Sequence, residues 1–460
     1  MNTFSRRLFL ERASLGAMKG IALGSTIGTA WAQSEKGSDS NVQVELPRGR
    51  VPLSFIIDDS TCLVNMGRFC MPQFAATYPE RADYQRPWVE WPHEIPDSFV
   101  REFGEWCAEH GVKGKYSIVP YPACVGWLDR VLPGWSQQQL RDSLQLVREL
   151  MVPHWDIHPE MITHTRAIDL KTGRPFEGFS PAHMENSYPQ EDVSVDYLSS
   201  YLAYALRILK NCDLPCEGIT TPGGFGNRVK EKLPLAVFEA VRDVYGVDLP
   251  HYFKYVADGD ESTEPTIEAL RDASSDTPSL TMNVPAGTGD WFGGWDGFEE
   301  SHGEKYATPD GQNGRMVELI RNRRPAIMLC HWPGLYGNGS RSGFEDFQQV
   351  VLSLTRHYGD QTMWMKVSEI GRYWAAKELT HLERTESEIR LSAPFSCENF
   401  TLRIPNQRVQ MAGLQSDKES HVFSPVLSMT ALRANNFFVD ANDTVLCFKL
   451  PRGTSHIRFS

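Results

Sequence analysis

The sequence lacks the signatures of several large protein classes. No glycine-rich motif of the GxGxxG or Walker type follows any predicted strand, which weighs against a nucleotide-binding fold. Positive charge is not in excess either: 58 acidic and 46 basic side chains give a formal net charge of −12, which argues against nucleic acid as a partner. We find no internal repeat and no long low-complexity tract. The 41% hydrophobic content is typical of a soluble globular protein.

The cysteines do not form a recognisable framework. There are nine, and an odd number cannot pair completely. Cys212 and Cys216 are separated by three residues, so they do not form a CxxC motif. We expect most of the nine to be small buried hydrophobic residues, with room for one or two disulfides in an oxidising compartment.

After the N-terminal region, no segment is apolar enough to span a bilayer. Residues 5–10 read Ser-Arg-Arg-Leu-Phe-Leu, which resembles a twin-arginine export signal, and Ala-Trp-Ala at 30–32 resembles a cleavage site. The intervening apolar stretch is short and interrupted by Lys19, which argues against a stable membrane anchor. We therefore predict a signal peptide over 1–32, a flexible leader over 33–50, and a periplasmic or secreted protein.

From residue 51 onward, short apolar runs alternate with amphipathic segments. Strands are expected at 51–58, 116–119, 155–158, 218–221, 252–256, 280–284, 326–330 and 363–367. The main helices between them are expected to begin near 96 and at 136, 195, 230, 315, 344 and 368. Alternation of this kind predicts an α/β fold with a parallel sheet, and about eight repeats suit a distorted TIM-like (β/α)7–8 barrel over residues 51–378. An open, doubly wound sheet is the alternative.

The helical pattern stops near residue 379. Short runs with alternating apolar side chains follow, as expected for half-buried strands, at 389–392, 400–404, 409–411, 445–450 and 455–459. We predict a small C-terminal antiparallel β domain over 379–460, with no protein partner implied.

Acidic and imidazole side chains follow several of the predicted strands. In parallel α/β barrels, catalytic groups lie at the C-terminal ends of the strands. The groups at these ends are Asp58, Asp59, His158, Glu160, His164, Asp290 and His331. One Asp and two neutral His commonly hold a catalytic divalent metal, and a second carboxylate can take a proton from water. The structural alternatives are a turn or helix cap for the aspartates and a buried core position for each histidine.

The ordered series of motifs resembles the polysaccharide deacetylase superfamily, the NodB-like deacetylases. Residues 55–59 read Phe-Ile-Ile-Asp-Asp, like the family's first motif. The resemblance implies that Asp58 is the catalytic base and that Asp59 binds the metal. Residues 327–331 read Ile-Met-Leu-Cys-His, like the fifth motif. The resemblance to this fifth motif implies that Leu329 shapes the acetyl pocket and that His331 is the general acid.

The second motif of the family supplies two metal-binding histidines, and residues 156–164 resemble it. The resemblance implies His158 and His164 as ligands of a divalent ion, with zinc expected. The family's two histidines are normally four residues apart, whereas these are six apart. His154 and Glu160 each have the four-residue spacing to one of them and remain alternative ligands.

The remaining motifs are implied to line the substrate groove. Thr221, Pro222 and Gly223 resemble the third motif, a Pro/Gly turn. The family's third motif also carries an arginine that orients the base; Thr220 stands at that position here, and Arg228 is the nearest candidate replacement. Asp290 and Trp291 resemble the fourth motif. Trp291 also has the alternative of packing within its own loop.

Taken together, the resemblance implies an exported hydrolase that uses metal-activated water to remove acetyl groups from an N- or O-acetylated carbohydrate polymer. Two other functions stay open. One is a glycoside hydrolase on a related barrel, which would need two carboxylates about 5–10 Å apart. The other is a catalytically degenerate glycan-binding protein. Long insertions at about 60–95, 165–193 and 286–312 reshape the groove, so the resemblance does not identify the glycan.

Overall fold

The computed structural model describes residues 42–273, 275 and 277–460. The predicted signal peptide and the leader before residue 42 lie outside the described residues. Within the described part of the chain, no helix is both long and apolar enough to cross a membrane. The chain divides into two compact units: residues 50–273 with 278–374, and residues 42–49 with 375–460. The change of unit after residue 374 lies close to the predicted boundary after residue 378.

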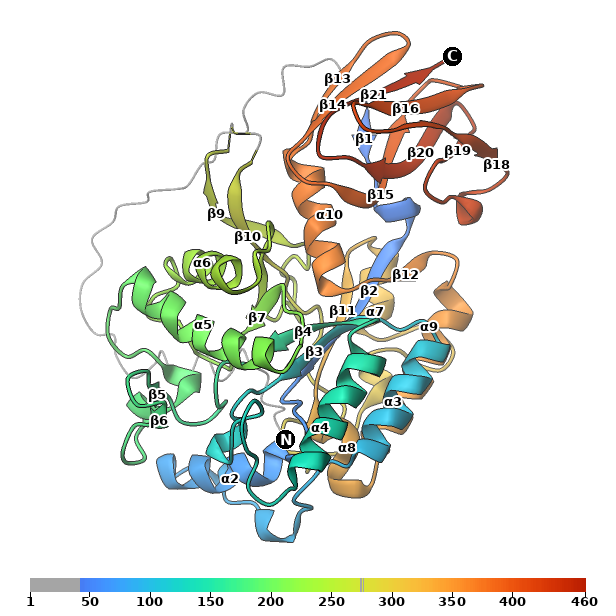
Figure 1. The fold of residues 1–460 in the computed structure, drawn as a ribbon. Coiled ribbons are helices and arrows are strands. Elements are labelled where there is room, and N and C mark those ends of the chain that lie inside the picture. Colours follow the sequence, from blue (N-terminus) through green and yellow to red (C-terminus); the bar gives the residue numbers. More distant parts are fainter. Residues whose placement is uncertain (1–41, 274, 276) are drawn as a thin grey trace, which may run out of the picture. The chain divides into compact units, whose positions relative to one another are not determined.

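The first unit is built around a parallel sheet (Figure 1). Its central strand is β2 (Val51–Asp58), which pairs with β11 (Ala326–His331), β3 (Gly114–Ile118) and β12 (Thr362–Trp364). β4 (Trp155–Pro159) pairs with β3. Every residue of β2 is buried, as expected of a strand covered on both faces, and this explains its nearly continuous apolar run.

A second sheet completes the first unit. β7 (Gly218–Thr220), β8 (His251–Phe253) and β10 (Ser279–Asn283) are parallel neighbours, and β9 (Thr266–Arg271) lies antiparallel at the edge. β9 lies between two strands that sequence periodicity predicts, but it is not itself predicted.

Two isolated parallel bridges lie at the seams between the two sheets. One pairs Glu160 with Thr220 and so links the end of β4 to β7; the other pairs Asp290, in the segment after β10, with Leu329 on β11. Among the described residues, the ladders therefore form two sheets joined by single bridges, rather than the continuous closed barrel that we expected. The segment after β10 runs as irregular backbone through the insertion at about 286–312, which interrupts the ladder there.

Helices follow most of these strands. They are α2 (Met66–Thr77), α3 (Asp97–Glu109), α4 (Gln137–Leu146), α5 (Val195–Asn211), α6 (Leu233–Tyr245), α7 (Arg315–Arg321), α8 (Trp332–Tyr336), α9 (Ser342–Tyr358) and α10 (Val367–Leu379). Figure 1 shows α3 and α9 beside the β2 sheet, and α5 and α6 beside β7 and β10. Ser136 caps α4 through a capping box with Gln139. α2 lies in the 60–95 insertion and has no counterpart among the predicted helices.

The second unit consists of two five-stranded sheets. The first is ordered β1 (Gln43–Val44), β15 (Cys397–Ile404), β20 (Asp443–Leu450), β19 (Asn436–Asp440) and β18 (Ser424–Val426). The second is ordered β13 (His381–Arg384), β14 (Glu388–Ala393), β21 (Gly453–Phe459), β16 (Ala412–Ser416) and β17 (Ser420–Val422). Because β1 pairs with β15, the last residues of the predicted flexible leader belong to this β unit.

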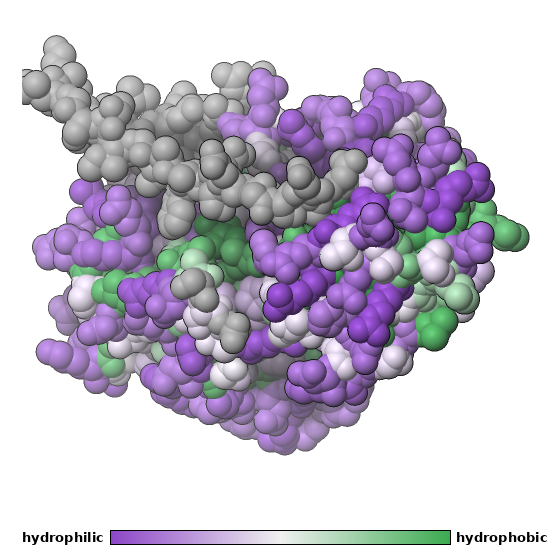
Figure 2. Space-filling view, turned by 90° about the horizontal axis from the view of Figure 1, so that it is seen from above, coloured by the Kyte–Doolittle hydropathy of each residue, from purple (hydrophilic) through white to green (hydrophobic). Residues whose placement is uncertain are grey.

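The described surface is mainly hydrophilic and most cysteines are buried, as the composition of the chain led us to expect. Hydrophilic residues dominate the described surface in the view of Figure 2. Eight of the nine cysteines are buried, as expected for small hydrophobic residues, and Cys124 is half-buried; the buried ones are Cys62, Cys70, Cys107, Cys212, Cys216, Cys330, Cys397 and Cys447.

Candidate metal centre and catalytic site

Asp59, Glu160 and His164 form a buried cluster at the carboxyl ends of β2 and β4. Each offers one ligand atom, and the three atoms lie within 4.8 Å of one another. His164 Nε2 lies 2.7 Å from Asp59 Oδ1 and 3.5 Å from Glu160 Oε1. The backbone N–H of Asp59 also donates to Glu160 Oε2 at 2.7 Å. The cluster is thus a compact set of one nitrogen and two carboxylate donors.

The loop that carries His164 is held by a buried carboxylate, Glu185. Its Oε2 accepts hydrogen bonds from the backbone N–H groups of Thr163 (2.9 Å) and His164 (2.6 Å). Its Oε1 accepts from the N–H of Ile162 (3.2 Å) and from the hydroxyl of Tyr201 (2.6 Å). His164 has a φ of 63°, which is uncommon for a residue other than glycine. Glu185 therefore stabilises the backbone conformation that directs His164 toward Asp59.

The electrostatics of the cluster suit a cation. Burial alone would lower the pKa of the His164 imidazole, but the charge of Asp59 and the hydrogen bonds that the imidazole donates to its neighbours raise that pKa well above its usual value. A proton on His164 then supplies the positive charge that two buried carboxylates need. A divalent ion would supply the same charge at the same place. Imidazole and carboxylate donors are typical zinc ligands, so the residues present fit such an ion.

Asp58, at the last position of β2, forms an ion pair with a buried lysine. The ammonium of Lys115 on β3 contacts Asp58 Oδ1, and both side chains are 0% exposed. Lys115 also donates to the carbonyl of Ile57 at 3.1 Å and to the Ser117 hydroxyl at 2.8 Å. A buried ion pair of this kind is stable only when its geometry is satisfied. Lys115 therefore fixes both the charge and the orientation of the Asp58 carboxylate.

This pair replaces the arrangement expected from the sequence. Arg228, the candidate for orienting the base, is exposed, and no ion pair joins it to Asp58 among the described residues. Thr220 instead contacts His158 Nδ1 at 3.2 Å. The cation beside Asp58 comes from β3, a strand on which we expected no site residue.

His158 lies outside the metal cluster, although we expected it to be a ligand. Its Nε2 lies 2.7 Å from Nε2 of His251 on β8, so one of the two rings donates to the other. Burial lowers the pKa of both imidazoles, to about 4 for His251. His154, the other alternative, precedes β4 and so lies at the opposite end of the strand from Glu160. Glu160, which the four-residue spacing to His164 had left as an alternative ligand, belongs to the cluster in place of His158.

His331 lies on the strand next to Asp58, in register with it. The parallel pairing of β11 and β2 places His331 directly opposite Asp58. His331 Nδ1 lies 2.6 Å from Asp290 Oδ2, so an N–H at Nδ1 donates to this carboxylate. Burial alone would lower the pKa of His331, but the hydrogen bond to Asp290 and the charges of nearby aspartates raise it to about 9. His331 is therefore a protonated group next to a carboxylate at neutral pH.

The other predicted groove residues lie around the same strand ends. Thr221 and Pro222 are buried directly after β7, and Gly223, with a φ of 43°, is half-buried. Leu329 is buried within β11, where its carbonyl accepts from the Tyr306 hydroxyl at 2.7 Å. Half-buried Trp291 packs against Tyr306, with ring centroids 4.9 Å apart, so packing holds this indole in its loop.

Two site residues were missed at the sequence level. Lys115 had only a weak local signal: it directly precedes the strand expected at 116–119, and a lysine that is buried there must be paired. Glu185 had none, because it lies in the 165–193 insertion and reaches His164 only through the tertiary fold.

No known family profile and no curated protein matches this sequence. Solved structures with some similarity include a mutant of a CE4-family pseudoenzyme (11% identity, 71% of this chain and 69% of that chain, TM-score 0.30). Another is a glycoside hydrolase/deacetylase from Parabacteroides distasonis (10% identity, 83% of this chain and 85% of that chain, TM-score 0.39). A third is an α-fucosidase from Thermotoga maritima in complex with a mechanism-based inhibitor (11% identity, 91% of this chain and 97% of that chain, TM-score 0.27). Since all three TM-scores lie below 0.5, these likenesses carry no argument about this chain, and the site rests on its own geometry.

Proposed function

We propose that this chain is a metal-dependent hydrolase of the NodB-like deacetylase type, which removes acetyl groups from an N- or O-acetylated carbohydrate. One observation carries the proposal. Asp59, which directly follows Asp58, belongs to a buried cluster with the donor set of a zinc site, and His331 stands opposite Asp58 on the next strand. A carboxylate, an imidazolium and a metal-ligand set at one rim are the groups that amide or ester hydrolysis by water requires.

Each residue has a role that its surroundings support. Asp59, Glu160 and His164 would hold a divalent ion, with zinc the preferred candidate from the donor types. When bound, such an ion supplies Lewis-acid stabilisation of a developing oxyanion and lowers the pKa of water. Asp58, kept charged and oriented by Lys115, takes the proton from the attacking water.

His331 completes the acid–base pair. Its pKa of about 9 keeps it protonated at neutral pH, and Asp290 holds its Nδ1 so that Nε2 is left to donate to the leaving amine or alcohol. The base begins charged and the acid begins protonated, as general acid–base hydrolysis demands.

The ligand set is tested by two matched amide substitutions. We expect Glu160→Gln to lose tightly bound metal, because it removes one donor from the cluster. We expect His158→Gln to keep the metal, because His158 contacts His251 and Thr220 instead. Metal content per folded chain is the measurement. Loss of metal in His158→Gln with retention in Glu160→Gln would overturn this ligand assignment.

The acid–base roles are tested by variants that spare the cluster. Asp58→Asn and His331→Ala should each retain metal and lose acetate release, because neither residue belongs to the donor set. Full activity in either variant would contradict its role. Release of reducing ends without acetate would instead favour a glycoside hydrolase. Glycan binding by a protein that contains no metal would favour a binding protein.

We also propose that residues 1–32 direct export through the twin-arginine route, on the strength of the sequence motif at 5–10. N-terminal sequencing of the protein from the periplasm should find a chain that begins at Gln33. A mature protein that retains residue 1 would contradict cleavage.

A further inference from the structure

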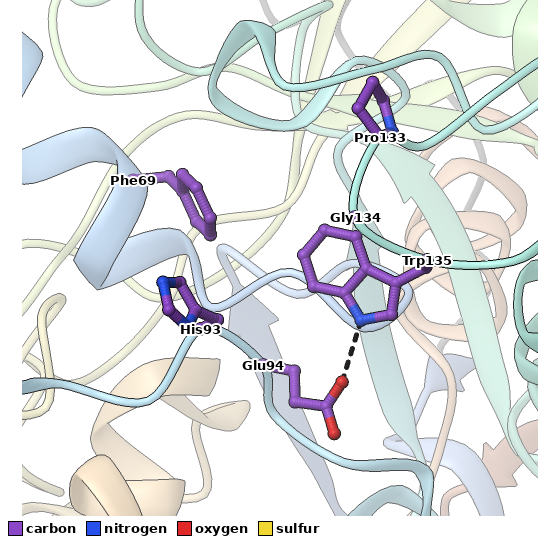
Figure 3. Close-up of a pocket in the computed structure, with 6 residues that line it drawn as sticks. All are labelled: Phe69, His93, Glu94, Pro133, Gly134 and Trp135. Carbon is purple, nitrogen blue, oxygen red and sulfur yellow. Dashed lines mark hydrogen bonds between the residues drawn. The ribbon is translucent and has the colours of Figure 1, made fainter.

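An open cavity of about 490 Å³ lies between the start of α2 and the loop that precedes α4 (Figure 3). Its lining residues are Phe69, His93, Glu94, Pro133, Gly134 and Trp135. None of them belongs to the metal cluster or to the acid–base pair. The walls offer two kinds of surface, aromatic rings and one carboxylate.

Three rings border the cavity. The centroids of Phe69 and Trp135 lie 6.5 Å apart at an interplanar angle of 59°, and the His93 ring lies 6.2 Å from Phe69. The Trp135 indole N–H donates to Glu94 Oε2 at 2.8 Å, which fixes the indole while the six-membered ring borders the cavity (Figure 3). Phe69 and Trp135 are half-buried, so part of each ring is available to a ligand. Such faces pack against the C–H face of a sugar ring and attract cations.

The carboxylate in this cavity has no cationic partner in the part of the chain that the structure describes. Among the described residues, neither a lysine nor an arginine forms an ion pair with Glu94, whose side chain contacts only the Trp135 indole by hydrogen bond. A second acid is close enough to interact: burial raises the pKa of Asp97, and the charge of Glu94 raises it further. The cavity therefore combines aromatic faces with uncompensated negative charge.

The cavity wall is attached to the segment that carries the metal ligand Asp59. The N–H of Asn65 donates to the His93 carbonyl at 3.0 Å, and the N–H of Ile95 donates to the Leu63 carbonyl at 2.9 Å. The strand-like segment around Glu94 is thus paired with the loop between β2 and α2. One wall of the cavity is therefore hydrogen-bonded to the loop that begins with Asp59, one of the three cluster residues.

We propose that this cavity binds a sugar residue that carries a free, protonated amino group. The aromatic rings would contact the apolar face of the pyranose, and Glu94 would accept hydrogen bonds from its ammonium. The choice of an amino sugar rests on the proposed function, because removal of acetyl from an amide leaves an amine that is protonated at mildly acidic pH. A chain already deacetylated at one residue would then be retained by the protein.

Isothermal titration calorimetry with two probes tests this proposal. The probes are the β-1,4-linked trimer of glucosamine and its fully N-acetylated counterpart, titrated at pH 6 into the full chain carrying Asp58→Asn, which prevents turnover. We expect the glucosamine trimer to bind at least about tenfold more tightly, since a charge-assisted hydrogen bond contributes about 1.5–3 kcal/mol. Raising the salt concentration should weaken its binding.

Three further variants, each made in the Asp58→Asn background, separate the pocket from general effects. Glu94→Gln should remove the preference for the amine form, and Trp135→Ala should weaken both trimers. Glu105→Gln removes an equal charge from a side chain that is 59% exposed on α3, and it should change nothing. Equal affinity for both trimers, or unchanged amine binding by Glu94→Gln, would overturn the proposal. Amine binding that depends on Glu94 in a protein that releases no acetate would instead overturn only the proposed function.

Discussion

Replacement of Glu185 by glutamine tests whether the backbone around His164 is held in place by one buried carboxylate. The two oxygens of Glu185 accept from three backbone N–H groups and the Tyr201 hydroxyl. Glutamine has the same size but only one acceptor oxygen. Its best orientation keeps that oxygen on the N–H groups of Thr163 and His164 and turns its NH2 toward Tyr201, whose hydroxyl can accept. The N–H of Ile162 then loses its partner.

The size of the effect follows from these contacts. One lost hydrogen bond costs about 1 kcal/mol, and the remaining bonds weaken because the acceptor is no longer charged. Burial, which raises the pKa of Glu185, shows that the charged form is itself costly to bury, and this offsets part of the loss. We therefore expect the free energy of unfolding to fall by about 2–3 kcal/mol. Metal affinity should fall about 10–100-fold, as is usual when a group that orients a ligand is changed.

The assay is a metal competition titration on Glu185→Gln, paired with chemical denaturation. Tyr201→Phe is the matched control, because it removes a hydroxyl that donates to Glu185 and accepts from the N–H of Ile168 but leaves the three backbone hydrogen bonds of Glu185 in place. It should lower the free energy of unfolding by about 1–2 kcal/mol and leave metal affinity within a few-fold of the natural protein. If Glu185→Gln binds metal as tightly as the unsubstituted chain, the Glu185 carboxylate is not what positions His164, because the loop then holds this histidine without it.

Two more predictions concern the acid–base pair. Lys115→Met should lower the free energy of unfolding by about 3–5 kcal/mol and abolish acetate release, because it leaves the buried Asp58 charge without its cation. Lys113→Met, which removes a partly exposed ion pair, should cost about 1 kcal/mol or less in the same denaturation assay, and an equal loss in both would contradict the role of Lys115. Asp290→Asn should move the alkaline limb of the pH–rate profile down by about 1–3 pH units, because a general acid works only while protonated and Asp290 raises the pKa of His331 to about 9. An alkaline limb at the same pH in Asp290→Asn would show that deprotonation of His331 does not cause this loss of activity.

Much of the fold was predictable because hydrophobic periodicity is a local property. The helix Val195–Asn211 begins at the expected residue, and Ser136 caps its helix as its position indicates. The edge strand β9 was not predicted, because its residues are all exposed or half-buried and show no apolar alternation. Closure of the barrel was overestimated, since the alternation of strands and helices does not reveal where an insertion interrupts a ladder.

The site was predictable only in part. Asp58, Asp59 and His331 end apolar strands, so the rule for parallel sheets places them correctly at one rim. Glu160 and His164 are four residues apart, but not on a helix: positive φ values at Met161 and His164 turn the loop, and the sequence does not show such a turn.

If Asp59, Glu160 and His164 hold a divalent ion that hydrolysis requires, activity must follow metal content. Acetate release from acetylated glycans by the purified full chain is measured together with its metal content before chelation, after chelation and after zinc is restored. We expect one ion per chain, loss of acetate release on chelation and recovery with zinc, whereas Glu160→Gln should hold no ion and release no acetate in any of the three states. Undiminished acetate release by metal-free protein would contradict this requirement for a metal.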